Sequence, residues 1–208
     1  MTKPVEKKVR RTQAERTALS DERMFAAAIR LINERGTQKT TLKDIGELAG
    51  YSRGLANYRF GSKDGLLAEL FTYFDGLWKT HLESHVGELT GFAALKAAET
   101  ALRDFLSLEA DYMRAMYILW YESLGHESET RARLSDHHTV YRKDVRRWVS
   151  EGIADGEIRE SVNAEQFAVQ YCAFVFGIVY QWLVNPDALD LDAVFKDYQA
   201  NQERILSA

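Results

Sequence analysis

Cysteine and proline are scarce in this sequence of 208 residues, which contains one of the first and two of the second. The single thiol, Cys172, cannot form a disulfide within the chain, and a lone cysteine suits a reducing cytoplasm. Few prolines and 46% hydrophobic residues favour a folded, mostly helical chain. The length is sufficient for one large or two small domains with buried cores.

The sequence also has few long apolar runs. The N-terminus is charged and lacks the apolar segment of a signal peptide. The longest nearly apolar run, residues 168–184, is interrupted by Gln170 and Gln181 and is marginal in length for a membrane span. We therefore expect residues 168–184 to form a buried helix in a cytoplasmic protein that does not enter a membrane.

Motifs of catalysis are a third absence. The sequence has no glycine-rich phosphate loop, no nucleophile elbow and no cysteine or histidine cluster at metal-ligand spacing. His81 and His85 lie four residues apart, but no third ligand follows at a nearby spacing. We expect no catalytic residue, no metal site and no cofactor. A helical enzyme with its site in the C-terminal domain is the minor alternative.

Charge is distributed unevenly along the chain, whose net charge is -4. Residues 1–65 carry 14 Lys or Arg and 8 Asp or Glu, and the remainder carries 13 and 23. A basic N-terminal part attracts phosphates, and an acidic remainder is repelled by them. Residues 1–19 are predicted to form a basic flexible arm that follows a DNA backbone or enters a minor groove. A disordered, solubilising tail explains them equally well. Residues past Thr12 could instead extend the first helix.

Closely spaced helix boundaries mark residues 20–67. Hydroxyl side chains stand where four helices would begin, at Ser20, Thr41, Ser52 and Ser62. Gly36 and Gly50 stand where the first two helices would end. The connection over residues 50–52 is so short that the second and third helices must cross sharply. Two short helices joined in this way predict a helix-turn-helix.

The third of these helices, residues 53–60, carries side chains suited to DNA. Ala56 and Phe60 are four residues apart and can face a core, which leaves the other positions on an outward face. Arg53 can bond guanine through its forked guanidinium, and Asn57 can pair with adenine. Gly54 would let the backbone approach a phosphate.

Residues 40–66 carry a dense set of spaced motifs: Thr40-Thr41-Leu42-x-Asp44-Ile45, Ala49-Gly50, Ser52-x-Gly54, Tyr58-x-Phe60, Ser62-Lys63-Asp64 and Leu66. Together they resemble the DNA-binding domain of TetR-type (TetR/AcrR) transcriptional regulators, over about the first third of the chain. The resemblance implies an all-α fold with two domains. One is an N-terminal three-helix helix-turn-helix domain, and the other is a larger C-terminal helical domain for ligand binding and dimerisation.

The candidate DNA-binding residues are Thr40, Thr41, Ser52, Arg53, Gly54, Leu55, Asn57, Tyr58, Arg59 and Lys63. The resemblance implies phosphate contacts from Thr40, Thr41, Tyr58 and Lys63, and base reading from Arg53 and its neighbours. This chain has Asn57 where the family usually has an aromatic residue. Tyr58 and Arg59 could replace the phosphate contact of that aromatic.

Bulky side chains recur at helical spacing in the predicted helices beyond residue 67, which include one helix over residues 92–108 and another over residues 109–124. Aromatic and methionine side chains on facing helices line apolar ligand cavities, although they are also ordinary core. The candidate ligand-binding residues are Trp78, Phe105, Met113, Met116, Tyr117, Trp120, Tyr121, His138, Tyr141 and Phe174. They predict an apolar or aromatic small-molecule effector.

The two helices predicted at the end of the chain, residues 164–184 and 190–205, are candidates for a dimer interface. The first is apolar nearly all round, and Ala173 and Gly177 would allow another backbone to approach closely. Paired with their copies, the two helices would form a four-helix interface, or they could only close the monomer core. The candidate interface residues are Phe167, Tyr171, Ala173, Phe174, Gly177, Ile178, Val194, Phe195 and Tyr198.

We predict a basic arm over residues 1–19, a DNA-binding domain over 20–66 and a regulatory and dimerisation domain over 67–208. The predicted function is sequence-specific transcriptional regulation, by a ligand-responsive repressor that binds a pseudo-palindromic double-stranded operator as a homodimer. A structural protein that binds DNA without sequence preference is the main alternative.

Overall fold

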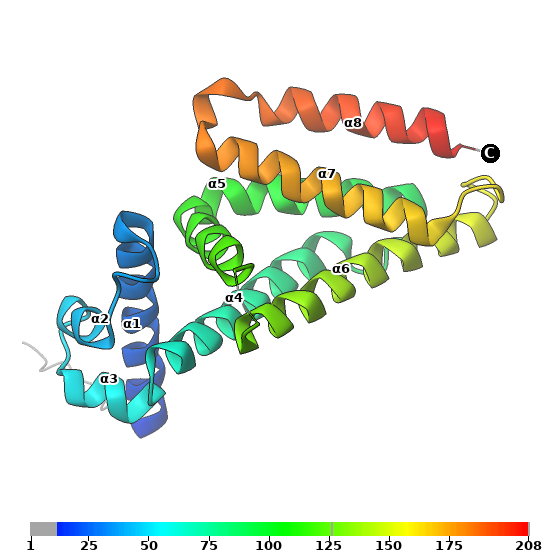
Figure 1. The fold of residues 1–208 in the computed structure, drawn as a ribbon. Coiled ribbons are helices and arrows are strands. Elements are labelled where there is room, and N and C mark those ends of the chain that lie inside the picture. Colours follow the sequence, from blue (N-terminus) through cyan, green and yellow to red (C-terminus); the bar gives the residue numbers. More distant parts are fainter. Residues whose placement is uncertain (1–11, 126, 208) are drawn as a thin grey trace, which may run out of the picture. The chain divides into compact units, whose positions relative to one another are not determined.

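The computed structural model describes residues 12–125 and 127–207 (Figure 1). Its elements are α1 (Gln13–Arg35), α2 (Leu42–Leu48), α3 (Arg53–Phe60), α4 (Lys63–Val86), α5 (Gly91–Ser123), α6 (Glu129–Ala154), α7 (Ala164–Val184), the 3₁₀ helix η1 (Pro186–Ala188) and α8 (Leu191–Leu206). Within these ranges there is no β-strand, only an isolated bridge between Ile158 and Ser207. The all-α prediction is confirmed.

The chain divides into two compact units, Met1–Leu66 and Leu67–Ala208. Helix α4 begins in the first unit and continues into the second. The predicted basic arm lies outside the described residues as far as residue 11. Residues 13–19 form the first turns of α1, so the alternative that residues past Thr12 extend the first helix holds and these residues do not belong to a flexible arm.

Helix α1 begins earlier than its predicted cap. Thr12 and Glu15 form a reciprocal capping box, in which Thr12 N–H donates to the Glu15 carboxylate at 2.7 Å and Glu15 N–H donates to the Thr12 hydroxyl at 3.2 Å. The prediction that Ser20 caps this helix is therefore wrong. Ser20 lies inside α1, and its hydroxyl donates to the Thr17 carbonyl at 2.7 Å.

The other predicted caps of the first unit are present. The hydroxyls of Thr41, Ser52 and Ser62 accept hydrogen bonds from the backbone N–H three residues on, at 3.2, 3.2 and 3.0 Å. Gly36 and Gly50 have φ of 76° and 80°, a region in which side chains are rarely found. These turns allow α1, α2 and α3 to share one core.

That core confirms the predicted orientation of α3. Ala56 is 0% and Phe60 7% exposed, and the Phe60 ring lies 5.9 Å from that of Phe25 on α1. Met24 and Ile45 are fully buried in the same unit. Because two positions of a two-turn helix are fixed inward, the other side chains of α3 face outward, apart from the half-buried Arg59.

In the second unit, α5 runs through the break predicted at residue 109. Glu109 has φ −129° and ψ 34°, which kinks the helix without ending it. Neither Gly nor Pro is present there to stop the hydrogen-bond ladder, so the helix resumes after one residue. The two helices predicted over residues 92–108 and 109–124 are the two arms of this kinked α5.

Helices α5, α6 and α7 pack successively against one another, and η1 reverses the chain so that α8 runs back along α7 (Figure 1). Their shared core includes Leu95, Trp148, Val149, Cys172 and Leu206. Among the described helices, only α7 has the length and hydropathy of a membrane span, and a third of its most apolar stretch is buried. Core helices of soluble proteins can have the same length and hydropathy. The expectation that residues 168–184 form a buried helix is met only in part within the single chain.

Candidate DNA-binding surface and aromatic cavity

The outward face of α3 is polar and strongly exposed. Ser52 caps the helix, and Arg53, Gly54 and Asn57 follow on its exposed side. Tyr58 is 89% exposed, which no folding requirement explains for an aromatic side chain. Its phenol can donate to a phosphate oxygen, while Arg53 and Asn57 match base edges in a major groove. Leu55, at 37%, stands beside this surface and can touch a thymine methyl.

The Arg59 side chain forms an ion pair within the first unit. Its guanidinium holds the Asp21 carboxylate of α1, with Nε 3.0 Å from each carboxylate oxygen and Nη2 2.9 Å from Oδ2. The Asp21 side chain is only 14% exposed, so this forked ion pair is partly withdrawn from water. Arg59 therefore fixes α3 on α1, and its predicted phosphate contact is not supported.

Two further candidates are also engaged within the first unit. Thr40 is 1% exposed, and its hydroxyl donates to the Gly36 carbonyl at 2.8 Å. Lys63 Nζ donates to the Thr37 carbonyl at 3.1 Å. The turn between α1 and α2 uses both groups, so the Thr40 side chain cannot reach a phosphate as expected.

Thr41 is exposed at the start of α2. Its hydroxyl donates to the Asp44 carboxylate at 2.8 Å, and Arg35 contacts the same carboxylate at 2.6 Å. The Thr41 hydroxyl, followed by Arg35, lowers the pKa of Asp44. The predicted contact residues that remain accessible are Thr41, Ser52, Arg53, Gly54, Leu55, Asn57 and Tyr58.

The second unit encloses an apolar cavity of about 70 Å³ among α4, α5, α6 and α7. Of the predicted ligand-binding residues, the structure brings together Trp78, Met113, Tyr117, Trp120 and Tyr141 around it. Lining residues that the sequence interpretation missed are Phe74, Leu82, Ala98, Leu102, Asp144, Val145, Trp148, Tyr171, Cys172, Val175, Phe176 and Val179.

The other predicted ligand-binding residues lie elsewhere. Tyr121 and His138 line a separate cavity of about 120 Å³, beside Tyr117 and Trp120. Phe105 and Met116 are 3% and 0% exposed in the core and line neither space. Phe174 stacks on Tyr198 with ring centroids 3.5 Å apart, because its position on α7 faces α8. The side chain that faces the cavity is Phe176, two residues further on.

A signal for part of the missed set was present in the sequence. Tyr141, Asp144, Val145 and Trp148 are spaced by three, four and seven residues from the first, so a helix places them on one face. Once Tyr141 was chosen as a lining residue, this register could have added the other three.

A groove of about 590 Å³ that is bordered by several charged side chains lies between α4 and α6, next to the cavity. Trp78, Leu82, Tyr141, Asp144 and Trp148 line both spaces. At its other end, His137 Nδ1 lies 2.7 Å from the Asp75 carboxylate. The two spaces therefore adjoin at these shared residues.

Burial controls the ionisation of the groups around these spaces. It raises the pKa of Tyr117 and raises that of Tyr141 well above its ordinary value, so both phenols stay neutral. Burial lowers the pKa of His138 to about 4, so its imidazole is neutral near pH 7. It raises the pKa of Asp144, against the opposing effect of Arg147.

Three indole N–H groups beside the cavity lack an acceptor. Within the described part of the chain, the Nε1 atoms of Trp78, Trp120 and Trp148 are buried and make no hydrogen bond. By contrast, the Tyr117 hydroxyl donates to the Phe176 carbonyl at 3.1 Å. Buried donors without acceptors destabilise a packed core and are typical of sites with another role.

The predicted dimer-interface residues separate into two groups. Tyr171, Ile178 and Phe195 are 5%, 6% and 3% exposed, so their side chains already pack within one chain. Ala173 is exposed, whereas Phe167, Phe174, Gly177, Val194 and Tyr198 are half-buried.

The sequence interpretation missed the most exposed apolar side chains of α7. Val169, Tyr180 and Val184 are 50%, 46% and 67% exposed. With Ala173 and Gly177 they follow one another at intervals of three or four residues, so they form one stripe along the helix. This stripe is the apolar surface that the single chain leaves uncovered on α7.

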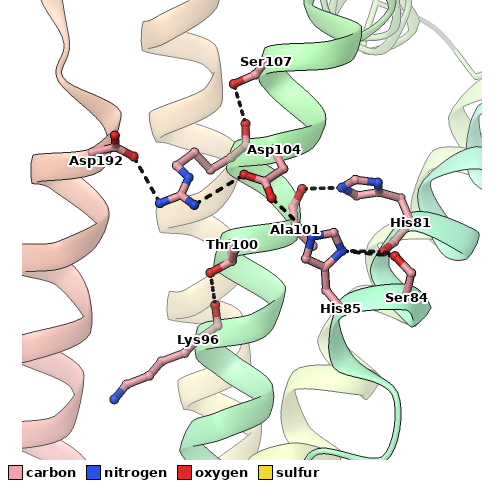
Figure 2. A network of polar contacts seen from close by, with 10 residues as sticks. His81, Ser84, His85, Lys96, Thr100, Ala101, Asp104, Ser107 and Asp192 are labelled. Atoms are coloured by element: carbon pink, nitrogen blue, oxygen red, sulfur yellow. Dashed lines mark hydrogen bonds and ion pairs between the residues drawn. The ribbon is translucent and has the colours of Figure 1, made fainter.

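Figure 2 shows polar contacts that join α4 to α5, and α5 to α8. His81 Nε2 lies 3.0 Å from the Ala101 carbonyl, and His85 Nε2 lies 3.3 Å from the Asp104 carboxylate. Arg103 contacts Asp104 at 3.4 Å and Asp192 of α8 at 3.2 Å. The two histidines considered as metal ligands thus serve as links between helices.

Comparison with known proteins agrees with this geometry. The model of bacterial regulatory proteins of the tetR family matches residues 25–70, and that of the tetracyclin repressor-like C-terminal domain matches residues 117–196. The HTH-type transcriptional regulator TtgR of Pseudomonas putida is 28% identical over 190 residues, covering 88% of this chain and 89% of that protein. The HTH-type transcriptional repressor KstR2 of Rhodococcus jostii is 26% identical over 175 residues, covering 82% and 83%.

Solved structures share the fold. A putative transcriptional regulator from Saccharomonospora viridis in complex with choline has a TM-score of 0.80 at 19% identity, covering 92% of this chain and 99% of that one. The SmeT–triclosan complex has a TM-score of 0.75 at 19% identity, covering 91% and 92%.

A capped, exposed recognition helix on a three-helix core, followed by a larger helical unit, defines a helix-turn-helix regulator of transcription. The chain belongs to the tetR family of bacterial regulatory proteins. The family assignment from the spaced motifs of residues 40–66 is confirmed.

Proposed function

We propose that this protein is a cytoplasmic, ligand-responsive repressor that binds a pseudo-palindromic operator as a homodimer and releases it when a small molecule occupies the aromatic cavity. The observation that carries the proposal is the face of α3, where Arg53, Asn57 and Tyr58 are exposed while Ala56 and Phe60 anchor the helix. TtgR and KstR2, which resemble the chain over more than four fifths of its length, are a regulator and a repressor of transcription.

The uncovered stripe of α7 supports the dimer. Its exposed side chains, Val169, Tyr180 and Val184, are apolar, and Ala173 and Gly177 between them permit close approach of a second helix. In a two-fold dimer each subunit supplies one α3, and the two helices read half-sites separated by about 34 Å or a multiple of it. An inverted repeat in the operator follows from this symmetry.

The size of the cavity supports a role in induction. At about 70 Å³ it is smaller than the roughly 300–1,000 Å³ of ordinary ligand pockets. A ligand that needs a pocket of ordinary size can therefore enter only if the helices around the cavity move apart. Helix α4 is one of these helices. A ligand shifts a conformational equilibrium only through its different affinity for the two states. The enlarged state would bind ligand better, and we expect it to bind the operator less well.

The effector is expected to be apolar or aromatic. Eight aromatic side chains line the cavity: Phe74, Trp78, Tyr117, Trp120, Tyr141, Trp148, Tyr171 and Phe176. Two of the similar folds were solved with triclosan and with choline, so small-molecule binding occurs in this architecture. Neither molecule is assigned to this chain on that basis.

The test is selection of bound fragments from a random duplex pool at near-physiological salt, followed by sequencing. We expect an inverted repeat from the native protein and from Ser135→Ala, an exposed control on α6. Asn57→Ala should relax the preference at one position in each half-site. Recovery of no motif, with weak and salt-sensitive binding, would identify a DNA-binding protein without sequence preference and refute the proposal.

A further inference from the structure

Asp144 is the single charged side chain among the residues that line the cavity. It lies on α6 with Tyr141 on the preceding turn and Trp148 on the following one, and all three also border the groove. Trp78 completes this boundary from α4, with its ring centroid 6.2 Å from that of Tyr141. A carboxylate is therefore set among aromatic rings at the point where cavity and groove meet.

The basic side chains of the groove are engaged with other partners. Lys79, Arg133 and Arg147 each pair with a glutamate four residues away on the same helix, at 3.7, 2.9 and 3.3 Å. Arg147 reaches Asp144 at 4.0 Å, the outer limit of an ion pair, and together with Lys143 and Lys79 it partly offsets the effect of burial. Burial raises the pKa of Asp144, which reflects an incompletely compensated charge. A further cation nearby would stabilise the charged form of this carboxylate.

Aromatic faces favour the same kind of ligand. A cation above a Trp or Tyr ring is attracted by the ring quadrupole, most strongly where water is excluded. Trp78, Tyr141 and Trp148 supply such rings beside Asp144. An anion at this point would instead meet a carboxylate of like charge, although the acceptor-free indole N–H groups nearby would attract it.

We propose that the effector is an organic cation with an apolar body, whose positive group lies against Asp144 at the boundary between the cavity and the groove. The apolar body occupies the cavity among the aromatic rings. The inference rests on the ligand-responsive function proposed above and specifies the class of molecule that this site takes.

The experiment uses the full chain without DNA and three probes of similar shape that differ in charge: phenyltrimethylammonium, tert-butylbenzene and benzenesulfonate. Calorimetric titration should show the cation binding at least about tenfold more tightly than the neutral probe. Asp144→Asn should weaken the cation by about tenfold and leave the neutral probe within about twofold. Asp144→Glu should retain the preference.

Asp136→Asn is the matched control, because Asp136 lies on the same helix and borders the groove but not the cavity. It should leave all three affinities unchanged. Equal binding of the cation and the neutral probe, tighter binding of benzenesulfonate, an unaffected Asp144→Asn, or no cation binding at 1 mM would each overturn the proposal.

A second arm separates this inference from the proposed function. The cation is added to the complex with the selected operator, and release is followed by fluorescence anisotropy. Binding that depends on Asp144 without release would support the cation site and contradict the effector role. Release by the neutral probe but not by the cation would support the ligand-responsive function and overturn the cation assignment.

Discussion

Replacement of Glu99 by glutamine is expected to stabilise the second unit, weakly at acidic pH and more strongly at neutral and alkaline pH. Glu99 lies on α5 and is 1% exposed. Burial raises its pKa from 4.5 to about 7, against smaller opposing effects of Gln199 and Gln202 on α8 and of Lys96. Glu99 therefore binds its proton more tightly in the folded chain than in the unfolded chain.

The linkage gives the sign and size of the effect. At low pH the carboxyl is neutral in both states and its ionisation costs nothing. As pH rises from 4.5 to 7, the unfolded chain loses the proton first, so stability falls until Glu99 ionises in the folded chain as well. The full cost is roughly 3 kcal/mol, at about 1.4 kcal/mol per pKa unit. Glutamine has a similar shape and no charge, so it removes this cost.

Urea unfolding followed by tryptophan fluorescence measures the difference. All four tryptophans lie between residues 78 and 182, so the signal reports on the unit that contains Glu99. We expect Glu99→Gln to gain about 1 kcal/mol at pH 5 and roughly 3 kcal/mol at pH 8. The exposed control Glu88→Gln should change stability little at either pH. A gain that is equal at both pH values, or a loss at pH 8, would refute the reasoning.

Three further predictions concern the two surfaces. Arg59→Ala should lower the free energy of unfolding by about 1–3 kcal/mol in circular-dichroism melts, because it leaves a partly buried aspartate without its partner. Arg30→Ala, from a mostly exposed pair, should cost under about 0.5 kcal/mol, and similar losses for the two variants would contradict the assignment. Arg53→Ala should cost about 1–3 kcal/mol on the selected operator and less on random duplex in anisotropy titrations, whereas equal losses would exclude base reading. Val184→Asp should shift the protein from dimer to monomer in light scattering, whereas the exposed control Leu108→Asp should leave the dimer intact. A dimer that persists in Val184→Asp would show that α7 does not form the interface.

Helix boundaries were predictable because their causes are local. Thr41, Ser52 and Ser62 cap their helices through bonds to residues three positions away, so the sequence alone contains both partners. Ser20 fails because an earlier capping box at Thr12 and Glu15 also satisfies a helix start. Two valid local signals competed, and the first one along the chain determined where α1 begins.

The use of individual side chains was less predictable because it depends on distant residues. Arg59 has the charge and position expected of a phosphate ligand, but Asp21, 38 residues earlier, holds its guanidinium. The sequence separation gives no indication of that pairing. Thr40 was likewise selected by its motif, while burial against Gly36 removes its hydroxyl from solvent.

For the cavity, the residue types of the lining were predictable from the sequence, whereas the rotation of each helix was not. Aromatic and methionine side chains predicted an apolar site, because residue type alone shows what can line one. Phe174 and Phe176 are equivalent by type, and only the rotation of α7 decides that Phe176 faces the cavity while Phe174 stacks on Tyr198. Asp144 was overlooked because a charge in a heavily charged helix suggests solvent exposure. On α6 its three-residue distance from Tyr141 places it at the cavity. Arg147, Lys143 and Lys79 only partly offset the effect of burial on this carboxylate, so the charge of the ligand is the property most open to test.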